Sequence, residues 1–319
     1  MSFKLIKSLD DSEWNKFVLS SPQGNLFCKT EFLEASKQSY DAYFVKKNEL
    51  ILLGVLIIKN TSEISINVPY IYQGLLFSEY IESLSFHKKC KVSLEIIEFL
   101  LREMEALYET ISLSLHHSFN DLRGIQWHNY DDKKRPQANL KLNYTGILKI
   151  DNKVVSFDKI LSDVRTSRRQ EYRKCLNNGF VVEESTDLSI LDSLHAKTFA
   201  RQGVSRSNGE IFMVTELAKN SLSKGFGKIL VCKDHKGTVA SASLFLFDDK
   251  TAYYLIGAND PQYRKDGVGS YLMLEQIRDF MDQGLSYIDF VGINSPLRGD
   301  YKTSFNASPL AYYSFTMKM

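Results

Sequence analysis

A short glycine-containing segment, Arg264-Lys265-Asp266-Gly267-Val268-Gly269, has the composition of an anion-binding turn. It follows a strand-like run that ends near Ala258 and precedes an amphipathic helix that begins near Ser270. The first N–H groups of a helix have no intrahelical acceptor, and the helix dipole makes that end positive. Glycine also allows a close approach to a ligand, because it has no Cβ. The segment can therefore hold a pyrophosphate, although a turn that only caps a helix has the same pattern.

A second chemical group, Asp289, lies near the end of the strand predicted at Leu285 to Val291. At a strand end that borders a cleft, a carboxylate can accept a proton from an ammonium group or orient it. The alternative is a structural role, in which Asp289 caps the backbone or pairs with a nearby arginine.

A basic helix is predicted between Ser162 and Asn177, where Arg165, Arg169 and either Tyr172 or Arg173 share one face. Guanidinium groups so arranged can converge on one anion, such as the phosphate of an activated sugar. A basic helix face that is simply exposed to water is the alternative, with equal weight. Arg201, at the end of a later helix, is a further candidate for binding a carboxylate or phosphate of a substrate.

The overall composition excludes several classes of protein. The 319 residues include 40 basic and 38 acidic side chains, with a net charge of +2, which is not the signature of a DNA-binding protein. No apolar run approaches the roughly 18 residues that span a bilayer, and no signal peptide is apparent, so we expect a cytoplasmic protein. The four cysteines are scattered without a Cys-x-x-Cys pair, so no metal site is predicted.

Helices and strands alternate along the whole chain, which predicts an α/β (α+β) fold. The polar stretch from Gln126 to Gln137 resembles a connection between domains. We therefore expect one domain at residues 1–130 and a second at residues 131–319. In the first, strands are predicted at Ala42–Lys47, Leu50–Lys59 and Ile64–Val68, before a long helix at Lys88–Tyr108.

The second half is organised around a set of consecutive strands. Helices are expected at Ser162–Asn177, Ile190–Arg201 and Gly209–Ser221. Three strands follow at Lys228–Lys233, Thr238–Phe247 and Ala252–Ala258, ahead of the glycine turn. This order repeats that of the first half in weaker form, without a repeat in the sequence itself.

This second half resembles the GNAT acyltransferase superfamily, and more narrowly its Fem-like branch, in which two GNAT-like domains share one chain. The strand, the [Arg/Gln]-x-x-Gly-x-[Gly/Ala] turn at Arg264–Gly269 and the helix after it have the GNAT order. Five further segments fit the Fem-like pattern: Asp121-x-Arg123-x-x-x-Trp127, Arg165–Lys174, Asp260-Pro261-x-Tyr263-Arg264, Asp289-Phe290 and Tyr301-Lys302-x-x-Phe305. The resemblance runs from about Phe119 to the C-terminus, and it implies two mixed, mostly antiparallel sheets flanked by helices.

The resemblance also implies roles for individual residues. The pyrophosphate of acyl-coenzyme A, most simply acetyl-coenzyme A, would contact the residues of the turn: Arg264, Lys265, Gly267, Val268, Gly269 and Ser270. Lys302 is similar to a lysine of the Fem-like acyl-transfer site, where it would stabilise developing negative charge beside Asp289; an exposed loop lysine is the alternative. A backbone N–H near Gly257 to Asn259 is the implied oxyanion donor, and Arg165, Arg169, Tyr172 and Arg201 are the implied acceptor contacts.

Three functional hypotheses follow. The first is an N-acyltransferase that moves an acyl group from coenzyme A to an amine, for example on a nucleotide-linked amino sugar used in surface polysaccharide. The second is a Fem-like ligase that uses aminoacyl-tRNA to build peptidoglycan cross-bridges. Many such ligases lack an intact turn, and binding RNA requires a broad basic face, so the sequence favours the first. The third is a non-catalytic module that binds coenzyme A or a nucleotide sugar, and the sequence leaves the oligomeric state open.

Overall fold

The computed structural model describes residues 2–59 and 71–318, and the chain folds into two compact units. Unit 1 comprises residues 2–59, 71–143 and 311–318, and unit 2 comprises residues 144–310. The strand predicted at Ile64–Val68 lies outside the described residues. The sequence predicts that residues 1–130 and residues 131–319 each form a domain that folds independently. This division stays a prediction.

Unit 1 contains an antiparallel sheet with the strand order β1-β2-β3-β4. Its elements are β1 (Phe3–Lys7), α1 (Asp11–Ser20), a 3₁₀ turn (Leu26–Cys28), α2 (Thr30–Ala35), β2 (Tyr40–Lys47), β3 (Leu50–Ile58), β4 (Leu75–Phe77), α3 (Glu79–Ser83), α4 (Phe86–Leu107), β5 (Thr110–Ser114) and α5 (Arg123–Gln126). The end of the C-terminal strand β12 (Ser308–Lys318) pairs antiparallel with β5.

The period of two along β3 explains how unit 1 is packed. Leu53 and Val55 belong to a buried apolar cluster that also contains Ile96 and Leu100 of the long helix α4. Gly54, between them, faces α1 so closely that a Cβ there would lie 2.7 Å from the ring of Phe17. Alternate residues of one strand thus contact helices on its two faces.

Unit 2 contains most of the segments that the sequence singles out. Its elements are the second part of β6 (Asn139–Lys149), α6 (Phe157–Asp163), α7 (Thr166–Asn177), β7 (Val181–Glu184), α8 (Leu188–Arg201), α9 (Asn208–Phe212), a π-helical turn (Met213–Leu217), α10 (Ala218–Ser223), β8 (Gly227–Lys233), β9 (Val239–Phe247), β10 (Thr251–Asn259), a 3₁₀ turn (Pro261–Tyr263), α11 (Val268–Asp282), β11 (Tyr287–Asp289) and α12 (Pro296–Thr303).

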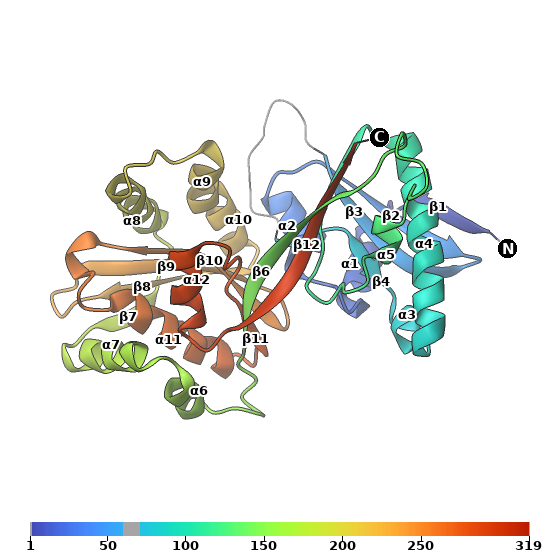
Figure 1. The fold of residues 1–319 in the computed structure, drawn as a ribbon. Coiled ribbons are helices and arrows are strands. Elements are labelled where there is room, and N and C mark those ends of the chain that lie inside the picture. Colours follow the sequence, from blue (N-terminus) through green and yellow to red (C-terminus); the bar gives the residue numbers. More distant parts are fainter. Residues whose placement is uncertain (1, 60–70, 319) are drawn as a thin grey trace. The chain divides into compact units, whose positions relative to one another are not determined.

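The strands of unit 2 follow the order β6-β11-β10-β9-β8-β7, in which only β10 and β11 run parallel. Figure 1 shows α6, α7 and α11 on one face of these strands and α8, α9 and α10 on the other. Seven consecutive residues of β9, from Ala240 to Leu246, are buried, as expected for a strand covered on both faces. The predicted mixed α/β class, with mostly antiparallel sheets flanked by helices, is confirmed.

Two of the predicted helices are interrupted. The helix expected at Ser162–Asn177 is two helices, because α6 ends at Asp163 and α7 begins at Thr166. Val164 and Arg165 between them have extended ψ angles of 155° and 140°. The helix expected at Gly209–Ser221 is divided by the π-helical turn. Apolar periodicity does not reveal either break, since it persists across both.

Candidate active site

Strands β10 and β11 separate in the middle of unit 2. Their parallel pairing covers only Thr251 to Tyr253, where Tyr253 lies opposite Asp289. A bulge follows in β10 between Tyr254 and Ile256, against the neighbouring strand β9. The later residues of β10, up to Asn259, therefore run on beyond their pairing with β11, which is the local arrangement that exposes backbone N–H groups. The segment Gly257–Asn259, the expected oxyanion donor, lies in this part.

Asp289, the last residue of β11, is 1% exposed. Its Oδ1 accepts a hydrogen bond from the backbone N–H of Val291 at 2.8 Å and another from the hydroxyl of Thr145 on β6. Val291 has a φ of 49°, a left-handed conformation that is strained for a β-branched residue. The carboxylate thus holds a strained backbone at the open end of the strand, where such strain is typical of functional sites.

Lys302 on α12 is bonded to the same backbone. Its ammonium group donates hydrogen bonds to the carbonyl oxygens of Val291 and Gly292, the second at 3.1 Å. The nitrogen also lies 5.6 Å from the ring centroid of Tyr254. Burial lowers the pKa of Lys302 to about 8, against the opposing attraction of Asp289, which raises it. Lys302 and Asp289, predicted as a catalytic pair, are therefore brought to the same short segment.

The glycine turn begins helix α11. Gly267 is the N-cap residue, with φ 79° and ψ 21°, and as a glycine it has no side chain to cap this end of the helix. A Cβ on Gly267 would lie 2.4 Å from the side chain of Glu171, so only glycine fits both the space and the angle. Arg264 and Lys265 are exposed just before it, whereas Val268 and Ser270 are buried.

Helix α7 supports this turn from the side. The ammonium group of Lys174 donates to the carbonyl oxygen of Lys265 at 3.0 Å and to the carboxylate of Asp266 at 2.9 Å. The thiol of Cys175 donates to the carbonyl oxygen of Asp266 at 3.3 Å. The backbone before Gly267 is thereby fixed by side chains from another helix.

Arg168 connects α7 to the start of α11. Its Nη1 donates to Glu171 Oε2 at 2.6 Å and to Ser270 Oγ at 2.7 Å. The guanidinium carbon lies 5.1 Å from the ring centroid of Tyr301 on α12, a cation–π distance. Arg168 thus links the glycine turn to the helix that carries Lys302.

The predicted acceptor residues lie at separate places. Arg165 forms a two-point ion pair with Asp300, at 2.8 and 2.6 Å. Arg169 is bonded to the carbonyl oxygens of Ser162 and Val164 at the break between α6 and α7.

Tyr172 and Arg201 differ from each other in exposure. Tyr172 is buried, and its hydroxyl donates to Glu275 and accepts from Arg278 on α11. Arg201 is exposed at the last position of α8. Within the described part of the chain the four predicted acceptor residues therefore do not form one cluster of open cations.

The turn has two features that suit an anionic donor. The helix start at Gly267 has no side-chain cap, and the exposed Arg264 and Lys265 precede it. The space beside Gly267 is taken by the side chain of Glu171. Among residues 2–59 and 71–318, no group of three His, Cys, Asp or Glu side chains is placed to hold a metal ion.

A family model described as an acetyltransferase (GNAT) domain matches residues 162–303. A comparison with curated protein sequences gives no match. Among solved structures, a crystal structure of FemX has a TM-score of 0.71 at 14% identity, covering 98% of this chain and 97% of that one. A tandem GNAT protein from the clavulanic acid biosynthesis pathway has a TM-score of 0.55 at 8% identity, covering 99% and 98%. L-PGS from Bacillus licheniformis has a TM-score of 0.52 at 11% identity, covering 97% and 92%.

Residues 162–303 thus match a GNAT acetyltransferase domain, and the chain has the fold of FemX and of a tandem GNAT protein, as the resemblance implies. The match supports an acyltransferase, and a GNAT domain implies an acyl-coenzyme A donor in general terms. The matched residues include the glycine turn, Asp289 and Lys302. No helix in residues 2–59 or 71–318 has the length and apolar character needed to cross a bilayer.

Several contributors to the site have no signal in the sequence. The strained backbone at Val291 is unexpected, since a β-branched residue predicts an ordinary strand conformation. Thr145 lies far from Asp289 in the chain and meets it only because β6 pairs with β11. Arg168 is visible as one charge of a basic helix, but its contact with Ser270 depends on how α7 packs against α11.

Proposed function

We propose that this protein is an N-acyltransferase that moves an acetyl group from acetyl-coenzyme A to an amine, with a nucleotide-linked amino sugar as acceptor. The observation that carries the proposal is the buried Lys302, bonded to the strained Val291–Gly292 backbone beside Asp289. It lies in the same unit as the uncapped glycine turn. The proposal assigns this chemistry to the predicted domain at residues 131–319.

On the donor side, the backbone N–H groups of Gly267, Val268 and Gly269 would bind the pyrophosphate, with Arg264 and Lys265 adding charge. Ser270 would position this end of the helix through its hydrogen bond from Arg168. The bound thioester supplies an activated acyl group. The residues at the open end of β10, Gly257–Asn259, would offer backbone N–H groups toward the acyl oxygen.

The catalytic pair would act through charge. Lys302 is protonated below its pKa of about 8, and its positive charge would stabilise the negative charge that develops on acyl transfer. Asp289 would keep that ammonium group charged and would accept the proton that the attacking amine loses, while the C–S bond breaks and coenzyme A leaves as the thiolate, which takes up a proton. The hydrogen bonds to Val291 and Gly292 fix the position of the Lys302 nitrogen.

On the acceptor side, Arg201 is exposed and would be the first contact for a phosphate. Arg165, Arg169 and Tyr172 are already bonded to other residues of the chain. They would have to break those bonds to bind the acceptor, or they would only hold neighbouring elements of the site in place. A nucleotide sugar offers such a phosphate together with an amine, and a place in the synthesis of cell-envelope polysaccharide in the cytoplasm follows from that choice of acceptor.

The Fem-like fold supports one competing function, transfer from aminoacyl-tRNA. The near-neutral charge of the chain argues against an RNA-sized basic face. The two functions differ in donor, so a direct test can separate them.

The test is a thiol-release assay with acetyl-coenzyme A and a panel of amines that includes UDP-linked amino sugars, with intact-mass detection of the product. We expect coenzyme A release that depends on an amino sugar nucleotide and falls at least about 100-fold in Lys302→Ala. Native mass spectrometry of the purified protein gives an independent reading of the bound donor. Transfer from aminoacyl-tRNA, with none from acetyl-coenzyme A, would overturn the proposal.

A further inference from the structure

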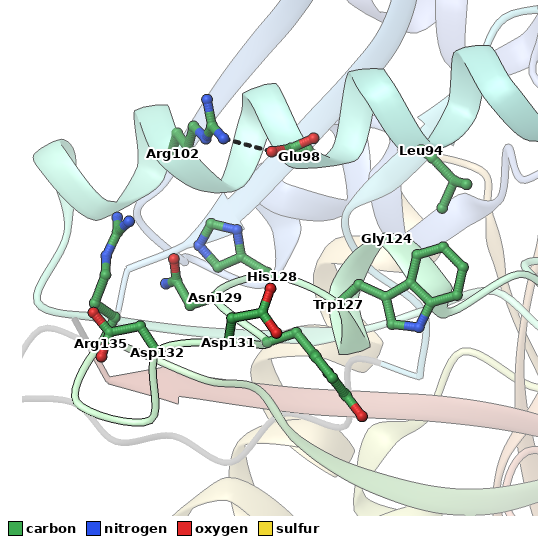
Figure 2. Close-up of a pocket in the computed structure, with 11 residues that line it drawn as sticks. Leu94, Glu98, Arg102, Gly124, Trp127, His128, Asn129, Asp131, Asp132 and Arg135 are labelled. Atoms are coloured by element: carbon green, nitrogen blue, oxygen red, sulfur yellow. Dashed lines mark hydrogen bonds and ion pairs between the residues drawn. The ribbon is translucent and has the colours of Figure 1, made fainter.

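Unit 1 contains a polar hollow of about 350 Å³ beside α4, lined largely by the loop that follows α5 (Figure 2). Arg102 is paired with Glu98 on α4 itself. The carboxylate of Glu105 accepts hydrogen bonds from Arg135 at 2.7 Å and from the ring of His128 at 2.6 Å. Figure 2 shows these last two side chains turned toward α4. These bonds fix the loop to the helix, so the three cationic or titratable groups have partners within the chain.

Arg298 on α12 is, by contrast, an exposed cation without a partner in the chain. It forms no hydrogen bond or ion pair with any residue in the ranges 2–59 and 71–318. Two other arginines of unit 2 are paired, Arg165 with Asp300 and Arg206 with Asp192. Asp300 also belongs to α12, but residues two positions apart on a helix do not face each other. The helix that carries Arg298 therefore does not compensate its charge.

Arg298 lies one helical turn before Lys302 on the same face of α12. Side chains four positions apart are neighbours on a helix, with Cβ atoms about 6 Å apart. Like charges at this spacing destabilise a helix. Lys302 has Asp289 as a counter-charge, whereas Arg298 has none. A locally unfavourable arrangement of this kind is typical of functional sites, and an anion bound at Arg298 would relieve it.

The surroundings of Arg298 place it near the open end of β11. The next residue, Gly299, packs against the segment that follows β11, because a Cβ there would lie 2.7 Å from the carbonyl oxygen of Ile293. Burial lowers the pKa of His195 on α8, and the charge of Arg298 lowers it further. Burial likewise lowers the pKa of Lys302, and Arg298 adds to that effect. The guanidinium group is therefore within electrostatic range of both α8 and the Lys302 ammonium group.

We propose that Arg298 binds the phosphate of the acceptor and thereby holds the acceptor amine beside Lys302 and Asp289. This assignment rests on the proposed function, and it names the residue through which the site recognises an anionic acceptor. A guanidinium group matches two phosphate oxygens with two parallel hydrogen bonds. Because Arg298 and Lys302 are only one turn apart, the best acceptor is a sugar with its amine and its phosphate on neighbouring ring carbons.

Glucosamine 1-phosphate and glucosamine test this directly, since they carry the same amine and differ in one phosphate group. Initial rates of coenzyme A release at saturating acetyl-coenzyme A give kcat and KM for each acceptor. We expect the wild type to prefer the phosphorylated sugar. Arg298→Gln should raise the KM for glucosamine 1-phosphate about tenfold, as for a lost charged hydrogen bond, with kcat changed less than about twofold. It should leave kcat/KM for glucosamine within about twofold. Arg298→Lys keeps the charge without the two-point contact, so its KM should rise less.

Isothermal titration of glucosamine 1-phosphate without donor measures the same contact independently of turnover, and its Kd should rise about tenfold in Arg298→Gln. The matched control is Lys219→Gln, which removes an exposed cation on α10 of the same unit and should leave KM and Kd unchanged. No binding by the wild type, equal KM and Kd in Arg298→Gln, or no preference for the phosphorylated sugar would refute the role of Arg298. Binding through Arg298 without any acetyl transfer would instead contradict the proposed function.

Discussion

The ammonium group of Lys302 donates a hydrogen bond to the carbonyl oxygen of Val291, a residue held at φ 49°. The N–H of the same residue donates to Asp289. The N–H and the carbonyl oxygen of the strained residue Val291 are therefore hydrogen-bonded to Asp289 and Lys302. These are the two residues that we predict from the sequence to be catalytic. Positions of this kind are held only when the surroundings determine them, and here a buried cation and a buried carboxylate do so.

The pH dependence of the reaction should report on Lys302. Its pKa is lowered to about 8 by burial, and the charged form is the active one in this mechanism. Activity should therefore fall as the pH rises through about 8. In Lys302→Arg the side chain stays charged, so this decline should disappear even if the rate is lower. Rates from pH 6 to 10, at saturating donor and acceptor, measure it; a decline at the same pH in both proteins would assign it to another group.

Asp289→Asn should move that decline to lower pH. The charge of Asp289 raises the pKa of Lys302, and the amide keeps an acceptor oxygen for Thr145 and Val291 while removing the charge. We also expect kcat to fall about 100-fold, because the amide cannot take up a proton. An unshifted pH profile with full activity would remove Asp289 from the site.

Val291→Gly should change the free energy of unfolding very little. Glycine relieves strain of about 1 to 3 kcal/mol, which offsets its greater backbone entropy and the lost side-chain contacts. The net change in the free energy of unfolding should be within about 1 kcal/mol of zero. Val239→Gly, at a half-buried strand position, is the control and should lose about 2 kcal/mol. Urea denaturation compares them, and equal losses would contradict the strain argument.

The ion pair of Arg165 with Asp300 allows a test of the acceptor assignment. Both side chains are largely exposed, at 46% and 63%, so breaking the pair should change stability by less than about 1 kcal/mol. If Arg165 binds an acceptor phosphate, Asp300→Asn frees it and should lower the acceptor KM. Arg165→Ala should raise that KM about tenfold, as expected for a lost charged hydrogen bond. Initial rates at varied acceptor decide this, since a purely structural arginine would leave KM unchanged in both variants.

The sequence predicts the regular elements of unit 2 closely. The strands expected at Lys228–Lys233 and Ala252–Ala258 correspond to β8 (Gly227–Lys233) and β10 (Thr251–Asn259). Periodicity and turn residues determine such elements locally. The pairing of the C-terminal strand β12 with β5 was not predicted, because it joins residues some 200 positions apart, which no local pattern encodes.

Some features of the candidate site can likewise be predicted from the sequence, and others cannot. The glycine turn can be predicted from the sequence, because its backbone conformation requires glycine. The meeting of Asp289 with Lys302 is suggested by resemblance and not by spacing. The strain at Val291 and the support from Arg168 depend on tertiary packing, which overrides local preference at both places.

Binding of acetyl-coenzyme A at the glycine turn is the most direct test of the central claim. Isothermal titration would compare the wild type with Gly267→Asp and Gly284→Asp. The two glycines lie at opposite ends of α11 with similar φ angles, 79° and 85°, so both changes strain the backbone of one helix. Gly267 also adjoins the proposed phosphate site and contacts Glu171, whereas no described atom lies within 4 Å of a Cβ placed on Gly284. We predict that Gly284→Asp keeps the wild-type affinity within about twofold, whereas Gly267→Asp weakens it at least about tenfold. No heat with the wild type, or the same affinity in all three proteins, would contradict the assignment.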